Sequence, residues 1–188
     1  MNIYDFDGTI YDGDSTVDFY LFSLSKKPNI LRYVFQQVKG IVLYSTHRID
    51  KTRLKEYFFC FLPAIDVEKM VGQFWKNKKT RIRQWYMNQR NSDDIIISAS
   101  PEFLLKPICD EIGVSHLIAS EVDPDTGRFL SENCYGKNKV ERLLSDRDVS
   151  IESFDRFYTD SKSDRPLALL AKEAYLVQRN SISRWTIE

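Results

Sequence analysis

The hydrophobic positions divide the chain into two parts with different patterns. Residues 1–10 contain a short apolar strand that runs into a glycine-containing loop, and residues 14–90 then show helical spacing with many aromatic and basic side chains. From Asp93 onward, short apolar runs alternate with amphipathic segments. In this second part we predict strands at residues 95–97, 116–119 and 154–158, and a closing strand at 175–177.

Cap and turn residues predict the elements that connect these strands. Pro101 suits the first turn of a helix that ends near Gly113, and Ser100 is a suitable N-cap for it. The remaining predicted elements are a small hairpin over residues 122–129, turning at 125–127, and helices around residues 140–144 and 166–172.

Strands that alternate with helices favour an α/β fold. We predict a Rossmann-like parallel sheet with helices on both faces, since each crossover helix must cover one face of the sheet. Residues 14–90 then become an all-helical insertion after the first strand. The predicted domains are therefore a core of residues 1–13 and 91–188 and a helical cap of residues 14–90.

Charge and cysteine content narrow the possible partners and compartment. Basic and acidic residues are equal at 27 each, which gives no electrostatic reason to expect nucleic acid. The cysteines Cys60, Cys109 and Cys134 are widely spaced and odd in number, a pattern typical of a reduced cytoplasmic protein. We expect neither a signal peptide nor a membrane-spanning helix. The segment from Ile30 to Tyr44 is interrupted by polar residues and could at most lie on a membrane.

Acidic and hydroxyl side chains follow three of the predicted strands. Asp5 and Asp7 come after the first strand, Ser98 after the second, and Asp160 with Asp164 after a later one. Ligands of parallel α/β sheets bind beyond the carboxyl ends of the strands, so these side chains are expected at one site. Neighbouring carboxylates repel each other, and a hard cation such as Mg²⁺ would hold them ionised beside a substrate phosphate.

Four segments in order resemble the motifs of the haloacid dehalogenase-like hydrolase superfamily. They are Asp5-Phe6-Asp7-Gly8-Thr9, Ile95-Ile96-Ile97-Ser98, the Lys139 segment 136–143 and Asp160-Ser161-Lys162-Ser163-Asp164. Each motif alone would be weak, but the ordered set covers both ends of the chain. The position of the helical insertion, between the first two motifs, resembles the C1 cap of the phosphoserine-phosphatase-like branch.

The resemblance implies a Mg²⁺-dependent phosphohydrolase with defined roles for these residues. Asp5 would be the nucleophile that forms an aspartyl-phosphate, and Asp7 the general acid and base. Asp5, Asp7 through its backbone carbonyl, and Asp160 would hold Mg²⁺, with Asp164 in the outer shell of the metal. Ser98, Ala99 and Lys139 would bind the phosphate, and Lys139 would also offset the negative charge around Asp5.

Within that branch, the second half of the chain more closely resembles the phosphatidylglycerophosphatase C group. The shared features are segments 117–120, 134–140 and 158–167. This resemblance implies a lipid phosphate as substrate. A small soluble phosphomonoester, such as phosphoserine or a sugar phosphate, is the alternative. A non-catalytic phosphate- or phospholipid-binding module and phosphotransfer to an alcohol also remain open.

Several of these residues have a simpler structural interpretation. Lys137 competes with Lys139 as the catalytic lysine, although a position near a helix start favours Lys139. Ser98 could serve only as a hydrogen-bonding residue at a strand end, and Asp164 only as a helix N-cap. We expect Asp12, Asp14 and Ser15 to be loop and cap residues, with contact to substrate as the alternative. His47 and His116 are expected to be structural or surface residues.

The helical insertion combines aromatic and basic side chains. We expect its aromatic residues, such as Phe19, Phe58 and Phe61, to form a small core of their own, with an apolar substrate pocket or a membrane-facing surface as alternatives. The basic residues among them either attract anionic lipid, which would give a peripheral membrane contact at the inner face, or belong to ordinary solvated helix faces. These basic residues are Arg32, Lys39, Arg48, Lys51, Arg53 and Lys55.

Overall fold

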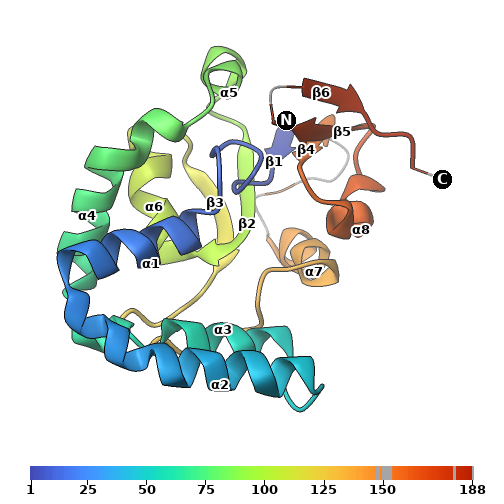
Figure 1. Cartoon of the computed structure of the whole chain (residues 1–188). Coiled ribbons are helices and arrows are strands. Elements are labelled where there is room, and N and C mark those ends of the chain that lie inside the picture. Colours follow the sequence, from blue (N-terminus) through green and yellow to red (C-terminus); the bar gives the residue numbers. More distant parts are fainter. Residues whose placement is uncertain (147–148, 150–153, 180, 188) are drawn as a thin grey trace.

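The computed structural model describes residues 1–146, 149, 154–179 and 181–187, and it contains one six-stranded sheet (Figure 1). The strand order is β3-β2-β1-β4-β5-β6, the order of a doubly wound nucleotide-binding sheet. Neighbours among β1 to β5 pair in parallel, and β6 runs antiparallel to β5. The predicted α/β fold with a parallel sheet is confirmed. The strands are β1 (Asn2–Tyr4), β2 (Ile95–Pro101), β3 (His116–Ser120), β4 (Arg156–Thr159), β5 (Glu173–Gln178) and β6 (Ser181–Arg184).

Alternation of side chains along the strands separates two hydrophobic clusters. Ile3 packs into one cluster and its neighbour Tyr4 into the other, and Ile95 and Ile96 divide in the same way. Since successive residues of a strand point to opposite faces, each cluster belongs to one face of the sheet. Both faces are therefore buried, which explains why the strands are continuous apolar runs.

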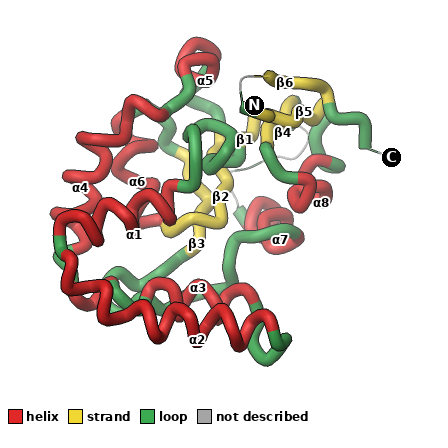
Figure 2. The backbone as a smooth tube through the Cα atoms, in the orientation of Figure 1, coloured by secondary structure: helices red, strands yellow, loops and turns green. Residues whose placement is uncertain are grey.

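Helices cover both faces of this sheet (Figures 1 and 2). On the face of Tyr4, the cluster includes buried residues of α1 (Ser15–Lys26), α4 (Val67–Lys78), α5 (Gln84–Gln89) and α6 (Glu102–Glu111). On the face of Ile3, it includes Leu143 of α7 (Lys137–Ser145) and Leu167 of α8 (Arg165–Ala168).

The other two helices, α2 (Val34–Ser45) and α3 (Lys51–Phe59), lie side by side at the far end of the molecule from β6 (Figure 1). Their close approach depends on Gly40, because a Cβ at this position would lie 2.4 Å from the Cβ of Tyr57. Short 3-10 turns link the helical region: η1 (Pro28–Tyr33), η2 (Leu62–Ala64) and η3 (Lys79–Arg81).

The aromatic residues of the helical region do not form a separate core, so this expectation is wrong. Phe19 and Phe61 belong to the same cluster as Tyr4 and Phe6 of the sheet region. The physical reason is the placement of α1 and α4, which pack against each other and bring the helical aromatics to the sheet-side cluster. Trp75 of α4, for example, meets the ring of Phe6 edge-on at a centroid distance of 6.0 Å.

The chain leaves the core and returns to it at adjacent positions. The backbone N–H of Asp12 donates to the carbonyl of Arg81 at 2.9 Å, and that of Arg83 donates to the carbonyl of Ile10 at 2.8 Å. Between these two hydrogen bonds, Tyr11 and Ile82 form an antiparallel bridge. The helical segment between residues 12 and 81 therefore begins and ends at two paired backbone segments, residues 10–12 and 81–83.

Several local predictions need correction. Ser100 is not an N-cap, because β2 continues to Pro101 and Pro101 occupies the N-cap position of α6. The helix predicted for residues 166–172 ends at Ala168, since the chain turns there and the N–H of Lys172 already bonds to the carbonyl of Phe154 at the approach to β5.

The strand at 175–177 does not close the sheet. An exposed edge strand follows it, and its single apolar residue, Ile182, left no hydrophobic pattern to predict it from. The hairpin at 122–129 is reduced to one bridge between Val122 and Phe129.

Candidate active site

A cavity of about 680 Å³ lies beyond the carboxyl ends of β1, β2 and β4. The residues that the sequence analysis assigned to catalysis and binding all line it, although they come from distant parts of the chain. They are Asp5, Asp7, Ser98, Ala99, Lys139, Asp160 and Asp164. The helical region contributes much of the remaining lining, in which apolar side chains alternate with polar and charged ones: Asp14, Thr16, Val17, Gln37, Ile41, Lys51, Leu54, Lys55 and Phe58.

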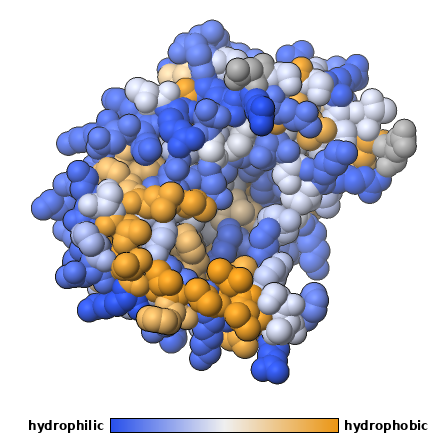
Figure 3. All heavy atoms as spheres, in the orientation of Figure 1, coloured by the Kyte–Doolittle hydropathy of each residue, from blue (hydrophilic) through white to orange (hydrophobic). Residues whose placement is uncertain are grey.

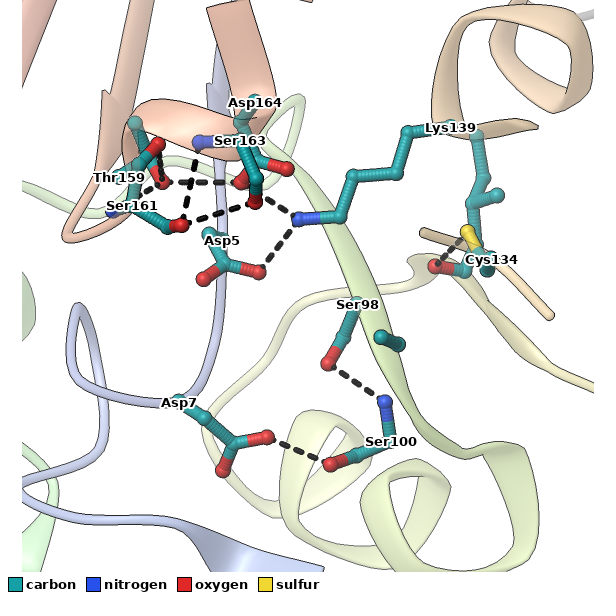
Figure 4. A network of polar contacts seen from close by, with 12 residues as sticks. Asp5, Asp7, Ser98, Ser100, Cys134, Lys139, Thr159, Ser161, Ser163 and Asp164 are labelled. Carbon is teal, nitrogen blue, oxygen red and sulfur yellow. Dashed lines mark hydrogen bonds and ion pairs between the residues drawn. The ribbon is translucent and has the colours of Figure 1, made fainter. Parts of the chain in front are cut away.

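Lys139 connects the two buried carboxylates of the site (Figure 4). Its Nζ lies 2.7 Å from Asp5 Oδ1 and 2.8 Å from Asp164 Oδ2, and Thr159 Oγ1 donates to the same Asp164 oxygen at 2.9 Å. Burial works against the charge of Lys139, but the two carboxylates outweigh it and the pKa of Lys139 is raised. The lysine therefore remains a cation between two anions that are shielded from water.

Desolvation and the charge of Lys139 have opposite effects on the pKa of Asp5. Its carboxyl group is buried, which raises its pKa to about 7, while the Lys139 ammonium acts in the opposite direction. Its backbone N–H is bonded to the carbonyl of Tyr158 at 2.9 Å, so the end of β1 is held against β4. A cation near Asp5 would favour the ionised form that a nucleophile requires.

Lys139 and Lys137 have different surroundings, although both lie in the first turn of α7. Lys137 is exposed and does not line the cavity, whereas Lys139 is 2% exposed. Two residues along a helix turn the side chain by more than half a revolution, so only one of the pair can point inward. The geometry places Lys139 at the candidate site.

Both carboxylate oxygens of Asp7 accept hydrogen bonds. The backbone N–H of Ser15 donates to Oδ1 at 2.6 Å, and Ser100 Oγ donates to Oδ2 at 2.5 Å. Burial raises the pKa of Asp7 to about 6, with Asp14 contributing in the same direction. The two hydrogen bonds orient the carboxyl group and act to lower its pKa, but burial outweighs them and brings its proton exchange close to neutral pH. The backbone carbonyl of Asp7 is the part of this residue that remains for a metal.

Asp160 and Gly8 meet at the lining of the cavity. Gly8 has φ of +71°, and a Cβ added to it would lie 2.0 Å from Asp160 Oδ2, so only glycine allows this approach. Burial raises the pKa of Asp160, and Asp164 adds to the effect. The Asp160 carboxylate thus lies against the Asp7-Gly8 backbone with no hydrogen bond to another described residue.

These donors fit Mg²⁺. Within the described ranges, no three His, Cys, Asp or Glu side chains gather closely enough to hold a metal by themselves. Mg²⁺ does not need such a cage, because it keeps several waters and binds one or two carboxylates together with a substrate phosphate. Two side-chain carboxylates, Asp5 and Asp160, and the Asp7 carbonyl match that requirement.

Ser98 and Ala99 lie where the register of β2 shifts between Ile97 and Pro101. Ser98 is buried, and its Oγ accepts the backbone N–H of Ser100 at 3.1 Å. The carbonyl of Ala99 accepts Ser120 Oγ at 3.1 Å. The irregular strand end thus aligns two serines along the cavity wall, with Ser100 turned to Asp7 (Figure 4).

Lys55 is the residue whose position the sequence analysis missed. It was considered only as one of several basic residues, yet its Nζ donates to the carbonyl of Ala99 at 2.6 Å and to Asn133 Oδ1 at 3.1 Å. Burial, followed by repulsion from Lys51, lowers its pKa to about 8. Its spacing of four residues from Lys51 on one helix was the available signal, because such residues share a face.

The other polar candidates have structural roles. Asp14 caps α1 by accepting the N–H of Val17 at 2.9 Å, and Asp12 pairs with Arg83 at 2.7 Å. Of these, Asp14 also lines the cavity and Asp12 does not. His116 pairs with Asp146 at 2.8 Å, and His47 is exposed, so neither histidine reaches the cavity.

Comparison with known proteins agrees with this geometry. The family pattern of the haloacid dehalogenase-like hydrolases matches residues 3–169. The chain belongs to this family. The matched range contains all four motifs and the helical region between the first two.

Proteins similar to this chain in sequence or in fold include phosphatases. The chain is 28% identical over 95 residues to a histidinol-phosphatase of Neisseria meningitidis serogroup C (strain 8013), and the match covers 45% of this chain and 43% of the relative. Less than half of that relative is therefore spanned. A protein of unknown function from Bordetella pertussis Tohama I has a similar fold, with a TM-score of 0.73, 18% identity and coverage of 93% of this chain and 87% of the other. A phospho-aspartyl intermediate analogue of phosphoserine phosphatase is also similar, with a TM-score of 0.53, 13% identity and coverage of 92% and 83%.

Proposed function

We propose that this protein is a Mg²⁺-dependent phosphomonoesterase that acts through an aspartyl-phosphate on Asp5. The observation that carries the proposal is the buried Asp5–Lys139–Asp164 arrangement, with Asp7 lining the same cavity. A solely binding module would have no use for a carboxylate held in this way beside a second one with a pKa near neutrality. Membership of the hydrolase family supports the same reaction class.

In the first step, an oxygen of Asp5 forms a bond to phosphorus while the ester P–O bond breaks. Asp7 gives its proton to the leaving oxygen, so the product is a neutral alcohol and Asp5 carries the phosphoryl group. The pKa of Asp7, about 6, makes the protonated form accessible near neutral pH. Asp5 Oδ1 is held by Lys139 at 2.7 Å, which fixes the orientation of the attacking carboxylate.

In the second step, water attacks the phosphorus of the aspartyl-phosphate. Asp7 takes one proton from this water, the acyl P–O bond breaks, and inorganic phosphate and the Asp5 carboxylate are released. We assign the phosphoryl oxygens to Ser98 Oγ, the backbone at Ala99 and the Lys139 ammonium, which all line the cavity. Bound Mg²⁺, held by Asp5, Asp160 and the Asp7 carbonyl, would supply charge stabilisation to the same oxygens.

The test is phosphate release with and without Mg²⁺ for the wild type and for Asp5→Asn. We expect Mg²⁺-dependent release that falls by at least about 10³-fold in the variant, because the nucleophile is lost. Asp93→Asn, a change in the exposed loop before β2, is the matched control and should retain activity. Equal release by wild type and Asp5→Asn would refute the proposal. Beryllofluoride, which mimics an aspartyl-phosphate, should bind with Mg²⁺ to the wild type only, and this distinguishes an enzyme from a phosphate-binding module.

For the substrate, we propose a phosphomonoester with a lipid part, such as phosphatidylglycerophosphate. The helical region 14–90, which we propose to be a C1 cap domain, supplies apolar side chains to the cavity: Val17, Ile41, Leu54 and Phe58. The partial similarity to a histidinol-phosphatase favours a small soluble ester instead. A screen of phosphoserine, sugar phosphates, histidinol phosphate and detergent-dispersed phosphatidylglycerophosphate separates them, and turnover of soluble esters alone would remove the lipid proposal.

We also propose a cytoplasmic location for the enzyme. The cysteines Cys60, Cys109 and Cys134 are all free, which suits a reducing compartment. Fractionation of cells that express the chain tests this location, and recovery from an oxidising compartment would contradict it.

A further inference from the structure

The helix α2 has its polar and small residues inside and its apolar residues outside. Gln37 and Gly40 are buried, and the Gln37 amide bonds to the carbonyl of Phe58 at 3.0 Å. Phe35 is 85% exposed, Val38 49% and Val42 54%, and their spacing of three and four residues puts them on one stripe. A surface helix ordinarily turns such a stripe toward the core. This inversion needs an explanation beyond the fold.

The exposed stripe continues onto the neighbouring elements. Leu31 of η1 is 57% exposed and Leu21 of α1 54% exposed. Figure 3 shows hydrophobic side chains gathered over α1 and along α2 on one face of the molecule. We call the residues Leu21, Leu31, Phe35, Val38 and Val42 the apolar row. Contiguous exposed apolar surface of this kind marks a site of contact with a partner or a membrane.

The charges around the apolar row have one sign. No Asp or Glu occurs between residues 19 and 49. The same stretch carries exposed cations at Lys26, Lys27, Arg32, Lys39 and Arg48. Among them, Lys39 and Arg32 lie on α2 and η1 beside the row itself. An apolar row on a segment that carries basic residues and no acidic ones is complementary to a lipid surface, which is apolar below and anionic at its headgroups.

We propose that the apolar row rests on an anionic lipid bilayer, with Arg32 and Lys39 at the level of the lipid phosphates. No helix in the described part of the chain is long and apolar enough to cross a membrane, so the contact is along the surface. A protein partner would be expected to meet some acidic residues at the rim for specificity, and residues 19–49, which carry most of this surface, contain none.

The row also leads into the candidate active site. Val17 is 44% exposed and Ile41 59% exposed, they lie on α1 and α2 with the row, and both line the cavity. A bilayer that touches the row therefore meets the mouth of the cavity. A lipid phosphate in that bilayer could then enter the cavity directly. This second step rests on the proposed function, whereas binding of the apolar row to the bilayer does not.

The experiment is co-flotation of the full chain with vesicles of phosphatidylcholine alone or with added phosphatidylglycerol. The wild type should bind the anionic vesicles. Phe35→Asp should weaken binding at least about tenfold, because an aromatic side chain that the bilayer would cover is replaced by a charge. Lys39→Glu should weaken binding about fivefold and reduce its dependence on salt. The matched controls, Leu130→Asp at a residue 71% exposed elsewhere and Lys69→Glu on α4, should bind as the wild type does.

Two further measurements keep the outcomes separate. Phe35→Asp should hydrolyse a soluble ester, para-nitrophenyl phosphate, at the wild-type rate, which shows that the variant is folded. Asp5→Asn should bind vesicles normally, so failure of catalysis and failure of membrane binding are distinguishable. Equal binding of wild type and Phe35→Asp, or no binding by the wild type, would overturn the proposal. A wild-type dimer in sedimentation that Phe35→Asp converts to a monomer would also overturn it, because the row would then be an interface between two copies.

Discussion

The cavity wall that comes from the sheet holds its polar groups in fixed pairs, whereas the wall that comes from α1, α2 and α3 supplies most of the apolar side chains of the cavity. On the sheet side, Lys139 joins Asp5 and Asp164, and Asp7 has both oxygens bonded. On the helical side, the cations Lys51 and Lys55 lie among apolar residues of α1, α2 and α3. The difference separates two tasks, because preorganised charge serves bond breaking and an apolar surface selects what is attached to the phosphate.

Lys139→Ala tests the sheet wall most severely. The substitution leaves Asp5 and Asp164 buried beside each other without their shared cation, and we expect the free energy of unfolding to fall by about 3–5 kcal/mol in the absence of Mg²⁺. Urea unfolding followed by circular dichroism measures it. Lys137→Ala, two residues earlier on the same helix and exposed, should change the free energy by less than about 0.5 kcal/mol. Equal effects of the two substitutions would contradict the assigned pairing.

Gly8→Ala tests the close approach on the metal side of the same wall. A Cβ would overlap Asp160 Oδ2, and the left-handed φ of +71° adds roughly 1 kcal/mol of strain. We expect the Mg²⁺ concentration for half-maximal phosphate release to rise about 10–100-fold as Asp160 is displaced. Gly72→Ala on α4, where a Cβ would meet open space, is the control and should raise stability slightly. An unchanged Mg²⁺ requirement in Gly8→Ala would exclude Asp160 as a metal ligand.

Lys55→Met tests the helical wall and has the smallest expected effect. Burial lowers the pKa of Lys55 to about 8, below the ordinary lysine value that it regains on unfolding. Between these two pKa values the unfolded chain binds more protons, so the stability of the wild type should rise with pH. Relative to Lys55→Met, the wild type should gain on the order of 1 kcal/mol between pH 7.5 and pH 10. Urea unfolding of both proteins at each pH measures the difference, and a constant difference would show that Lys55 titrates normally.

Sequence patterns could predict which polar residues of the sheet wall lie together, because strand ends are specified locally. Asp5, Ser98 and Asp160 each follow an apolar run, and parallel strands bring such positions together without further information. Only the position near a helix start distinguished Lys139 from Lys137 as the candidate catalytic lysine. In the structure Lys139 is buried at the cavity and Lys137 is exposed.

The helical wall was harder to predict because its contacts are long-range. Lys55 and its acceptor Ala99 are 44 residues apart, and nothing in the spacing of either residue indicates that they meet. The inverted packing of α2 depends on Gly40 meeting Tyr57 of another helix, while a hydrophobic pattern predicts burial of the apolar side. The merged aromatic core likewise depends on how α1 and α4 approach the sheet.

The pair of backbone hydrogen bonds that joins Asp12 to Arg81 and Arg83 to Ile10 has a consequence for how such proteins diversify. The two ends of the segment between these bonds are held side by side, so the free energy of folding depends only weakly on the length of the segment. Doubling the length of a closed loop costs only about 0.6 kcal/mol of closure entropy. Helix α2 can then be lengthened, shortened or exchanged without moving Asp5 or Asp7, whereas α1 and α4 must stay, because they pack into the sheet-side cluster and Ser15 of α1 bonds to Asp7. A chimera that replaces α2 alone, residues 34–45, should therefore retain the proposed Mg²⁺-dependent phosphate release, and a change in its substrate would assign recognition to this helix, whose Gln37 and Ile41 line the cavity.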